Sequence, residues 1–187
     1  SIARRAMKVL DDVILSIRDM HQPVIAAVNG AAIGGGFCLA SACDLRYASD
    51  AAYFRAAGIN NGLTSTELGI SYLLPRQIGF SRAFDILITG RDVDAAEAER
   101  IGFVSKVVPG DALLDQCYEA AAGIIGFSHI GVELTKQLLW ASLDAASLHS
   151  QMNHEGHAQL YVRMTTGNFE EKIAAWKEGR TPVYTDE

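Results

Sequence analysis

The feature that most constrains the fold is a glycine-rich turn between a predicted buried strand and a predicted helix. Val24 to Val28 form a short apolar run rich in Val and Ile, which predicts a buried strand. Asn29-Gly30 closes that strand, and Gly34-Gly35-Gly36 then opens a small-residue helix that we expect over 37–42. A turn of this kind points backbone N–H groups at whatever lies above the helix N-terminus.

The spacing of these glycines excludes two kinds of phosphate site. A P-loop needs a lysine directly after its last glycine, but Phe37 and Cys38 follow the triplet. A dinucleotide fingerprint needs G-x-G-x-x-G, and the glycines at 30, 34, 35 and 36 lack that spacing. Two interpretations stay open. One is an oxyanion hole, in which a peptide N–H stabilises negative charge on a carbonyl oxygen; the other is a turn that only lets strand and helix pack closely.

Composition excludes several classes of partner. The 187 residues are 49% hydrophobic and 20% charged, which suits a chain with one sizeable buried core. The net charge is −6 and the basic residues are scattered, so we expect no nucleic acid partner. No apolar stretch reaches the roughly 20 residues that cross a bilayer, so we expect no membrane segment. The three cysteines form no CxxC pair, which predicts no disulfide framework, no zinc site and a reducing cytoplasm.

The order of the predicted elements indicates an α/β fold that gives way to a helical tail. Strands are expected over 24–28, 45–48, 52–56 and 103–108, and helices over 1–20, 37–42, 65–74, 81–88, 95–100, 113–125, 131–143, 148–165 and 169–178. We expect the helix that begins at Ser65 to stop before Pro75. The soft boundary between the two parts falls at 126–130. Because the chain starts inside a helix without an initiator Met, we expect it to be the later part of something longer.

Several motifs, in order along almost the whole chain, resemble the crotonase family, also called the enoyl-CoA hydratase/isomerase family. They are Gln22 to Gly36, Ala42-Cys43-Asp44-Leu45-Arg46, Leu73-Leu74-Pro75-Arg76-Gln77-Ile78-Gly79, Thr89-Gly90-Arg91, the stretch 95–102, and the tail around Phe169 and Arg180-Thr181-Pro182. The resemblance implies a spiral of β-β-α turns followed by helices that form trimers or hexamers. Residues 1–127 would be the later part of that spiral, and 128–187 a trimerisation region. Family members have a longer N-terminal portion.

The resemblance also implies the chemistry. The substrate would be an acyl-CoA thioester, with no separate cofactor and no metal. Its carbonyl oxygen would sit between two backbone N–H groups while an enolate forms. By position, one of these donors is the N–H of Gly35, and the other belongs to the N-terminal portion of the family fold.

The sequence departs from the family's hydratases at both acid–base positions. Hydration uses two glutamates, and these positions hold Cys38 and Gly58 here. Glu67 instead resembles, with a one-residue gap, an acidic position of the family's dienoyl-CoA isomerases, where one carboxylate can pass a proton between two carbons. The alternative is that Glu67 is a surface residue at a helix N-terminus, capped by Ser65 or Thr66.

Four further features have simpler explanations. A thiol at a helix start can act as a nucleophile, but with no histidine nearby we expect Cys38 to be a small buried hydrophobe. Asp44 and Arg46 are expected to bond backbone or each other. A histidine cluster lacks the H-E-x-x-H spacing and a third ligand, so we expect a solvated or interface face rather than a metal site. Its members are His149, His154 and His157.

Three functions follow from these residues. The first is an enzyme that acts on an enoyl-CoA through an oxyanion-stabilised enolate, with residues that favour double-bond isomerisation over hydration. The second is a family member that binds acyl-CoA without catalysis, which the loss of both hydratase glutamates would allow. The third is a structural oligomer built on the C-terminal helices. Binding of an acyl-CoA separates the third from the others, and turnover separates the first two.

Overall fold

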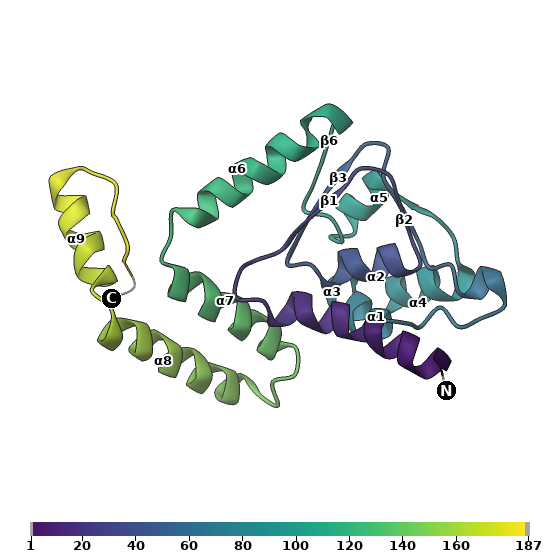
Figure 1. Ribbon diagram of the computed structural model, residues 1–187, viewed down its shortest axis with the longest axis horizontal. Coiled ribbons are helices and arrows are strands. Elements are labelled where there is room, and N and C mark those ends of the chain that lie inside the picture. Colours follow the sequence, from purple (N-terminus) through teal and green to yellow (C-terminus); the bar gives the residue numbers. More distant parts are fainter. Residues whose placement is uncertain (1, 186–187) are drawn as a thin grey trace. The chain divides into compact units, whose positions relative to one another are not determined.

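The computed structural model describes residues 2–185, and the chain divides into two compact units (Figure 1). The first unit extends to Tyr118 and the second begins at Glu119. Helix α6 (Leu113–Ile125) spans this division. Among residues 2–185, no helix combines the length and the apolar character needed to cross a membrane.

The first unit contains two small sheets, and its first four strands alternate between them. Strands β1 (Ile25–Val28), β3 (Leu45–Ser49) and β6 (Lys106–Val108) form one parallel sheet. Strands β2 (Ala31–Ile33), β4 (Tyr53–Arg55) and β5 (Val93–Asp94) form the other, in which β2 and β4 are parallel and β5 is antiparallel. From β1 to β4 the chain therefore adds one strand to each sheet per turn. This arrangement confirms the expected spiral of β-β-α turns.

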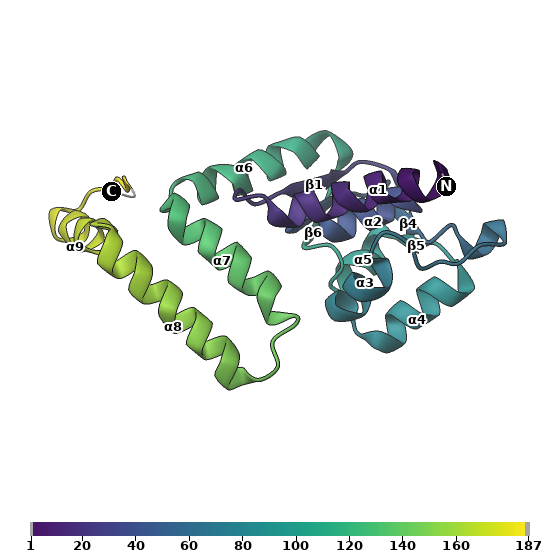
Figure 2. The same cartoon turned by 60° about the horizontal axis from the view of Figure 1, so that its bottom comes forward.

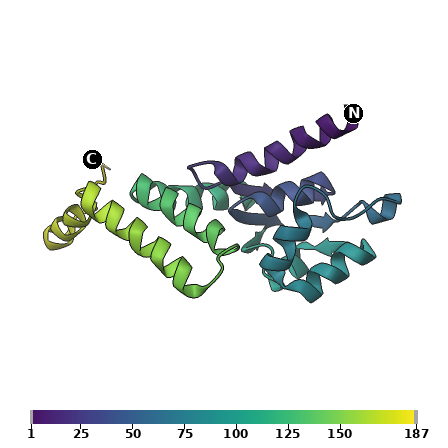
Figure 3. The same ribbon diagram turned by 90° about the horizontal axis from the view of Figure 1, so that it is seen from below.

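Helices surround these sheets in the first unit, and the ribbon views show them covering the strands (Figure 1). Helix α1 packs against α2, as the view in Figure 3 shows. Helices α3 and α4 form a second contacting pair, joined at Gly79. The bounds of the helices are α1 (Ile2–Asp19), α2 (Gly35–Ala42), α3 (Ile70–Ile78), α4 (Phe80–Thr89) and α5 (Ala95–Arg100), with 3-10 turns at Ile59–Asn61 and Gly110–Ala112.

A three-ring aromatic cluster forms the centre of the first unit's core. Phe37 of α2, Phe54 of β4 and Phe103 before β6 are all buried, with ring centroids 5.0–5.6 Å apart. Such tilted and edge-on contacts are the favoured geometries of aromatic pairs. Since the three rings come from three successive turns of the spiral, they fix α2 against both sheets.

Asp44 and Arg46 anchor the chain just before β1 and just before β6. The Asp44 carboxylate accepts a hydrogen bond from the Val24 N–H at 2.7 Å. The Arg46 guanidinium donates to the carbonyls of Phe103 at 2.6 Å and Cys43 at 2.7 Å, and it stacks on the Phe103 ring. Burial lowers the pKa of Arg46. Both residues therefore bond backbone, as expected.

The second unit consists of the end of α6 and three further helices, α7 (His129–Ser142), α8 (Leu148–Thr165) and α9 (Asn168–Glu178). Helices α7 and α8 lie side by side, which Figure 2 shows clearly. Ser128 and Ser147 cap their N-termini, accepting hydrogen bonds from N–H groups three residues on. The Gln151 amide of α8 donates to the Leu138 carbonyl of α7 and holds the pair together.

The chain after α9 folds back and is held by one ion-pair cluster. Arg180 donates to both carboxylate oxygens of Glu171 and to Glu178, and the Val183 N–H also donates to Glu171. These hydrogen bonds, with the nearby positive charge of Arg180, lower the pKa of Glu171 to about 2. The matched Arg180-Thr181-Pro182 segment thus has a structural role, because it holds the chain after α9 against that helix.

Two expectations about elements are wrong. The helix expected over 65–74 begins at Ile70 and continues through Pro75 to Ile78. Pro75 removes one helical hydrogen bond, but Leu73, Leu74 and Ile78 are buried, and their burial keeps the helix intact beyond the proline. Strands β2 and β5 were not expected, because a three-residue Ala-Ala-Ile strand and a two-residue strand carry no readable alternation.

Candidate active site at the glycine turn

Gly34 makes the turn between β2 and α2. It has φ +54° and ψ −116°, a conformation that residues with a side chain rarely adopt. Its N–H donates to the Arg55 carbonyl of β4 at 2.9 Å, and its carbonyl accepts from the Cys38 N–H at 3.1 Å. Helix α2 begins at Gly35, whose N–H has no hydrogen-bond acceptor among residues 2–185. An open N–H at this place is the donor that an oxyanion hole needs.

The Glu67 side chain lies against this glycine turn. A β-carbon at Gly34 would be only 3.4 Å from Glu67 Oε1, and one at Gly35 would be 3.7 Å from Leu68 Cδ1. Residues more than thirty positions apart in sequence are thus in contact. The structure therefore brings the two predicted site residues, Gly35 and Glu67, into one place.

Glu67 lies in a reverse turn before α3, not in the first turn of that helix. Its carbonyl accepts from the Ile70 N–H at 3.0 Å, and the two residues between them, Leu68 and Gly69, have φ +48° and +79°. Ser65 does not cap the helix, because its hydroxyl accepts the Ile59 N–H at 3.1 Å. The interpretation of Glu67 as a capped helix-start residue is therefore wrong.

Cys38 is buried beside Glu67, with 2% of its surface exposed. Its thiol donates to the Glu67 carbonyl, with 3.5 Å between sulfur and oxygen. Burial, reinforced by the negative charge of Glu67, raises the pKa of the Cys38 thiol to about 12. Its burial confirms the expectation of a small buried side chain, and the raised pKa disfavours a nucleophilic thiolate.

Gly58 opens a tight loop that leaves no room for a side chain. A β-carbon at Gly58 would lie 1.8 Å from the Thr64 carbonyl oxygen. The Gly58 carbonyl accepts hydrogen bonds from the N–H groups of Asn61 and Leu63, which draws the chain back on itself. A glutamate therefore cannot occupy this position in the observed conformation.

Comparisons with known proteins identify the family of this site. The sequence model of the enoyl-CoA hydratase/isomerase family matches residues 4–187. The chain belongs to this family. It is 65% identical over 185 residues to a probable enoyl-CoA hydratase, EchA12, of Mycobacterium tuberculosis, an alignment that covers 99% of this chain and 65% of the relative. The chain thus spans about two thirds of the length of that relative.

Solved structures of the family agree with this fold. A probable enoyl-CoA hydratase/isomerase from Mycobacterium abscessus superposes with a TM-score of 0.97 at 64% identity, covering 100% of this chain and 71% of that one. A protein described as a monofunctional enoyl-CoA isomerase from M. smegmatis has a TM-score of 0.72 at 68% identity, covering 77% of this chain and 68% of that one. The family membership and the α/β spiral expected from the sequence are confirmed.

The loop before Glu67 is fixed by a contact between Asn60 and Gly90 that the sequence did not reveal. The Asn60 side chain donates to the Gly90 carbonyl at 3.1 Å, and a β-carbon at Gly90 would lie 1.9 Å from Asn60 Oδ1. Gly90 ends α4 in the left-handed conformation with φ +62°. Asn60 can therefore approach Gly90 this closely only because position 90, in the matched Thr89-Gly90-Arg91 motif, has no side chain. In the sequence, the only sign of a left-handed backbone at Gly90 is its place directly after a predicted helix.

Arg91 of the same motif has a structural role. Its guanidinium donates two hydrogen bonds to Glu97 of α5, at 2.7 and 2.8 Å, and one to Asp85 of α4 at 2.8 Å. These bonds raise the pKa of Arg91 and lower that of Glu97. The cluster ties α4 to α5 on the outside of the spiral.

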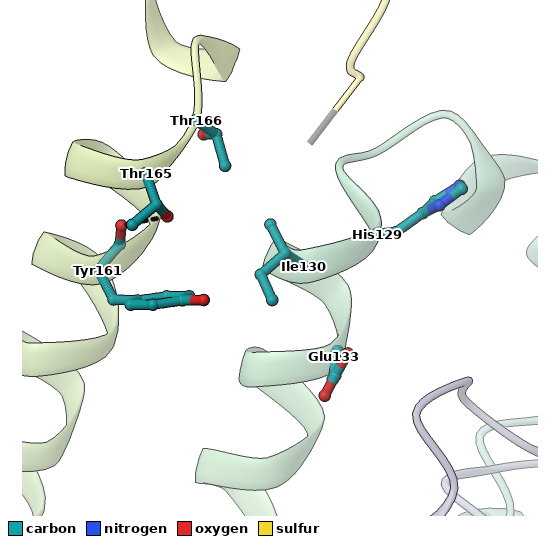
Figure 4. A pocket seen from close by; sticks show the side chains of 6 residues that line it. All are labelled: His129, Ile130, Glu133, Tyr161, Thr165 and Thr166. Carbon is teal, nitrogen blue, oxygen red and sulfur yellow. Dashed lines mark hydrogen bonds between the residues drawn. The ribbon is translucent and has the colours of Figure 1, made fainter. Parts of the chain in front are cut away.

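The second unit carries a separate open pocket of about 380 Å³ between α7 and α8 (Figure 4). Tyr161 and Ile130 point toward one another across it, and the Thr165 hydroxyl is turned to the Tyr161 carbonyl. The other lining residues are His129, Glu133 and Thr166. His149, His154 and His157 lie on α8, and the described part of the chain holds no group of three His, Cys, Asp or Glu side chains that could bind a metal.

The geometry at Gly58 makes a stability prediction. Gly58→Ala should lower the free energy of unfolding by about 3 kcal/mol, because the added carbon meets the Thr64 backbone. Gly30→Ala is the control, since nothing lies within 4 Å of its β-carbon, and it should change that free energy by less than about 1 kcal/mol. Urea unfolding of both variants measures the difference. A Gly58→Ala protein as stable as the parent would show that the loop tolerates a side chain.

The environment of Cys38 makes a reactivity prediction. With a thiol pKa of about 12, only about one molecule in 10⁴ carries the thiolate near pH 8, so iodoacetamide should leave Cys38 unmodified in the folded protein. The same cysteine should react readily in urea. Peptide mass spectrometry of both samples tests this. Rapid alkylation of folded protein at Cys38, with loss of turnover, would restore the nucleophile interpretation.

Proposed function

We propose that the chain carries part of the active centre of an acyl-CoA-metabolising enzyme that moves a double bond in an enoyl-CoA thioester. The observation that carries this proposal is the Glu67 carboxylate beside the glycine turn, 3.4 Å from where a side chain at Gly34 would begin. A single carboxylate next to an open backbone N–H is what an enolate-forming proton transfer needs. The CoA thioester is the substrate, and the reaction needs no further cofactor.

The proposed step is a proton shuttle. Glu67 removes a proton from the carbon next to the thioester carbonyl of a 3-enoyl-CoA, and the electron pair delocalises onto the carbonyl oxygen. The Gly35 N–H stabilises that oxygen, an interaction worth about 2.7 to 4 kcal/mol in comparable sites. Glu67 then returns the proton to the γ-carbon, which leaves the double bond between the α- and β-carbons. No water is consumed and no group leaves.

Hydration is disfavoured by the same site. It requires one group to activate water and another to deliver a proton, and the family's two glutamate positions hold Cys38 and Gly58. A buried protonated thiol is a poor base, and Gly58 has no space for a carboxylate. The description of the M. smegmatis relative as an enoyl-CoA isomerase supports isomerisation, whereas the M. tuberculosis relative is called a probable hydratase.

The proposed compartment and assembly follow from other parts of the chain. Three free, buried cysteines fit the reducing cytoplasm, where we place the reaction. The second unit exposes large apolar side chains, which suits burial against further copies of the chain in a homotrimer or hexamer. They include Tyr161 at 55%, Met164 at 82%, Phe169 at 55% and Trp176 at 74% exposed.

Glu67→Gln tests the proposed base. The variant keeps the shape of the side chain and should keep acyl-CoA binding, but its isomerisation rate should fall about 10²- to 10⁴-fold. Glu119→Gln, which changes an exposed carboxylate on α6, should match the parent. The assay supplies an enoyl-CoA that can be either hydrated or isomerised and separates the products by chromatography.

The outcomes of that assay separate the candidate functions. Faster hydration than isomerisation in the parent, or a Gln variant as active as the parent, would refute Glu67 as the isomerase base. Saturable acyl-CoA binding without turnover in the parent would favour a binding protein. No binding at all would favour a structural oligomer.

Met164→Glu tests the proposed assembly. Sedimentation of the parent at micromolar concentration should give a trimer or hexamer, and a charge at this highly exposed apolar position of α8 should shift it toward smaller species. Gln159→Glu, on the same helix, adds the same charge at an exposed polar position and should leave the assembly unchanged. A stable monomeric parent would contradict the proposal.

A further inference from the structure

We propose that Leu68 is a specificity-determining residue, whose side chain keeps water away from the enolate and so directs the site to isomerisation. This inference rests on the proposed function. Its first support is conformational: among the residues that the structure describes, Leu68 is the one non-glycine with positive φ, at +48°. Non-glycine residues held in this region cluster at functional sites.

The surrounding contacts hold Leu68 in this conformation. The Glu67 carbonyl accepts both the Ile70 N–H at 3.0 Å and the Cys38 thiol at 3.5 Å. Gly69 follows in the left-handed conformation as well, with φ +79°. Two successive left-handed residues make a tight reverse turn that directs the side chains of Glu67 and Leu68 toward the glycine turn.

The two side chains of this turn lie beside two successive residues of the glycine turn. Glu67 Oε1 lies against Gly34, and Leu68 Cδ1 lies 3.7 Å from where a β-carbon on Gly35 would be. Leu68 therefore places a methyl group beside the Cα of Gly35, the residue whose N–H is the proposed oxyanion donor. An apolar group there cannot orient a water molecule, and it lowers the local dielectric around the donor, which strengthens its hydrogen bond to the oxyanion.

A purely space-filling role does not explain this residue. Leu68 is only half-buried, whereas Leu73 and Leu74 of α3 are fully buried in relaxed helical backbone. Asn or Gly would adopt φ +48° with less strain than Leu. Leu68 thus keeps an apolar side chain beside Gly35 although its backbone conformation is strained.

Hydration chemistry would need a water molecule held at this site. The family's water-handling positions hold a buried thiol at Cys38 and a side-chain-free backbone at Gly58. With Leu68 over Gly35, a proton taken up by Glu67 has the substrate rather than solvent as its nearest acceptor. The proton should therefore return to the substrate within the same turnover.

Leu68→Asn tests this proposal, because Asn accepts the left-handed backbone and replaces the apolar cover with a polar group. Isomerisation is run in D₂O, and mass spectrometry measures solvent deuterium at the reprotonated carbon. The variant should incorporate at least about three times more deuterium than the parent and should form hydrated product. Leu68→Gly should behave in the same way, and it decides the question if the Asn variant fails to fold.

Two control variants separate the loss of the apolar side chain beside Gly35 from a general disturbance of the fold. Leu68→Met keeps an apolar side chain and should retain the parent's deuterium incorporation and product ratio. Leu63→Asn makes the same change at an exposed leucine in the preceding loop and should also match the parent. Folded, active Leu68→Asn and Leu68→Gly proteins with unchanged incorporation and product ratio would overturn the proposal.

The Glu67→Gln result tells the two proposals apart. If Glu67→Gln is inactive while the Leu68 variants behave like the parent, the base assignment stands and only the role of Leu68 fails. If Glu67→Gln is fully active, the proposed function fails, whatever the Leu68 variants do.

Discussion

The N–H of Gly34 donates to the carbonyl of Arg55, and this single hydrogen bond, 2.9 Å long, ties together β2, α2 and β4. The bond continues the pairing of β2 with β4, and the φ of +54° at Gly34 sets the direction in which α2 begins. The Glu67 carboxylate lies beside Gly34, where an added β-carbon would meet its Oε1 at 3.4 Å. The backbone conformation of Gly34 thus positions the open N–H of Gly35 beside the candidate base, Glu67.

The loop between β4 and α3 determines where Glu67 lies. It starts at Gly58, which packs against the Thr64 backbone, and Asn60 fixes it to the end of α4 through the Gly90 carbonyl. Each of these contacts depends on a glycine that a side chain would displace. The loop therefore has no side chain at Gly58, and it ends in the turn that contains Glu67 and Leu68.

The sequence was a good guide to regular elements and a poor guide to these close approaches. The helices over 95–100, 113–125 and 148–165 were predicted to the residue. Two of them follow Asp94 and Ser147, whose side chains cap the helix and mark its start in the sequence. Pro75 misled the prediction of α3, since tertiary burial of its neighbours outweighs one missing hydrogen bond. The contact of Glu67 with the glycine turn was expected only from family resemblance. The left-handed Leu68 and the tight packing of Gly58 and Gly90 leave no periodic signal.

The identity of residue 38 is physically linked to the presence of Glu67. The Cys38 thiol touches the Glu67 carbonyl, and the negative charge of Glu67 helps to raise its pKa to about 12. A glutamate at position 38 would put a second negative charge near Glu67 in a buried place, which disfavours the charged form of the added group. A neutral side chain at position 38 leaves Glu67 as the one acceptor beside the glycine turn, which suits a reaction that moves one proton between two carbons.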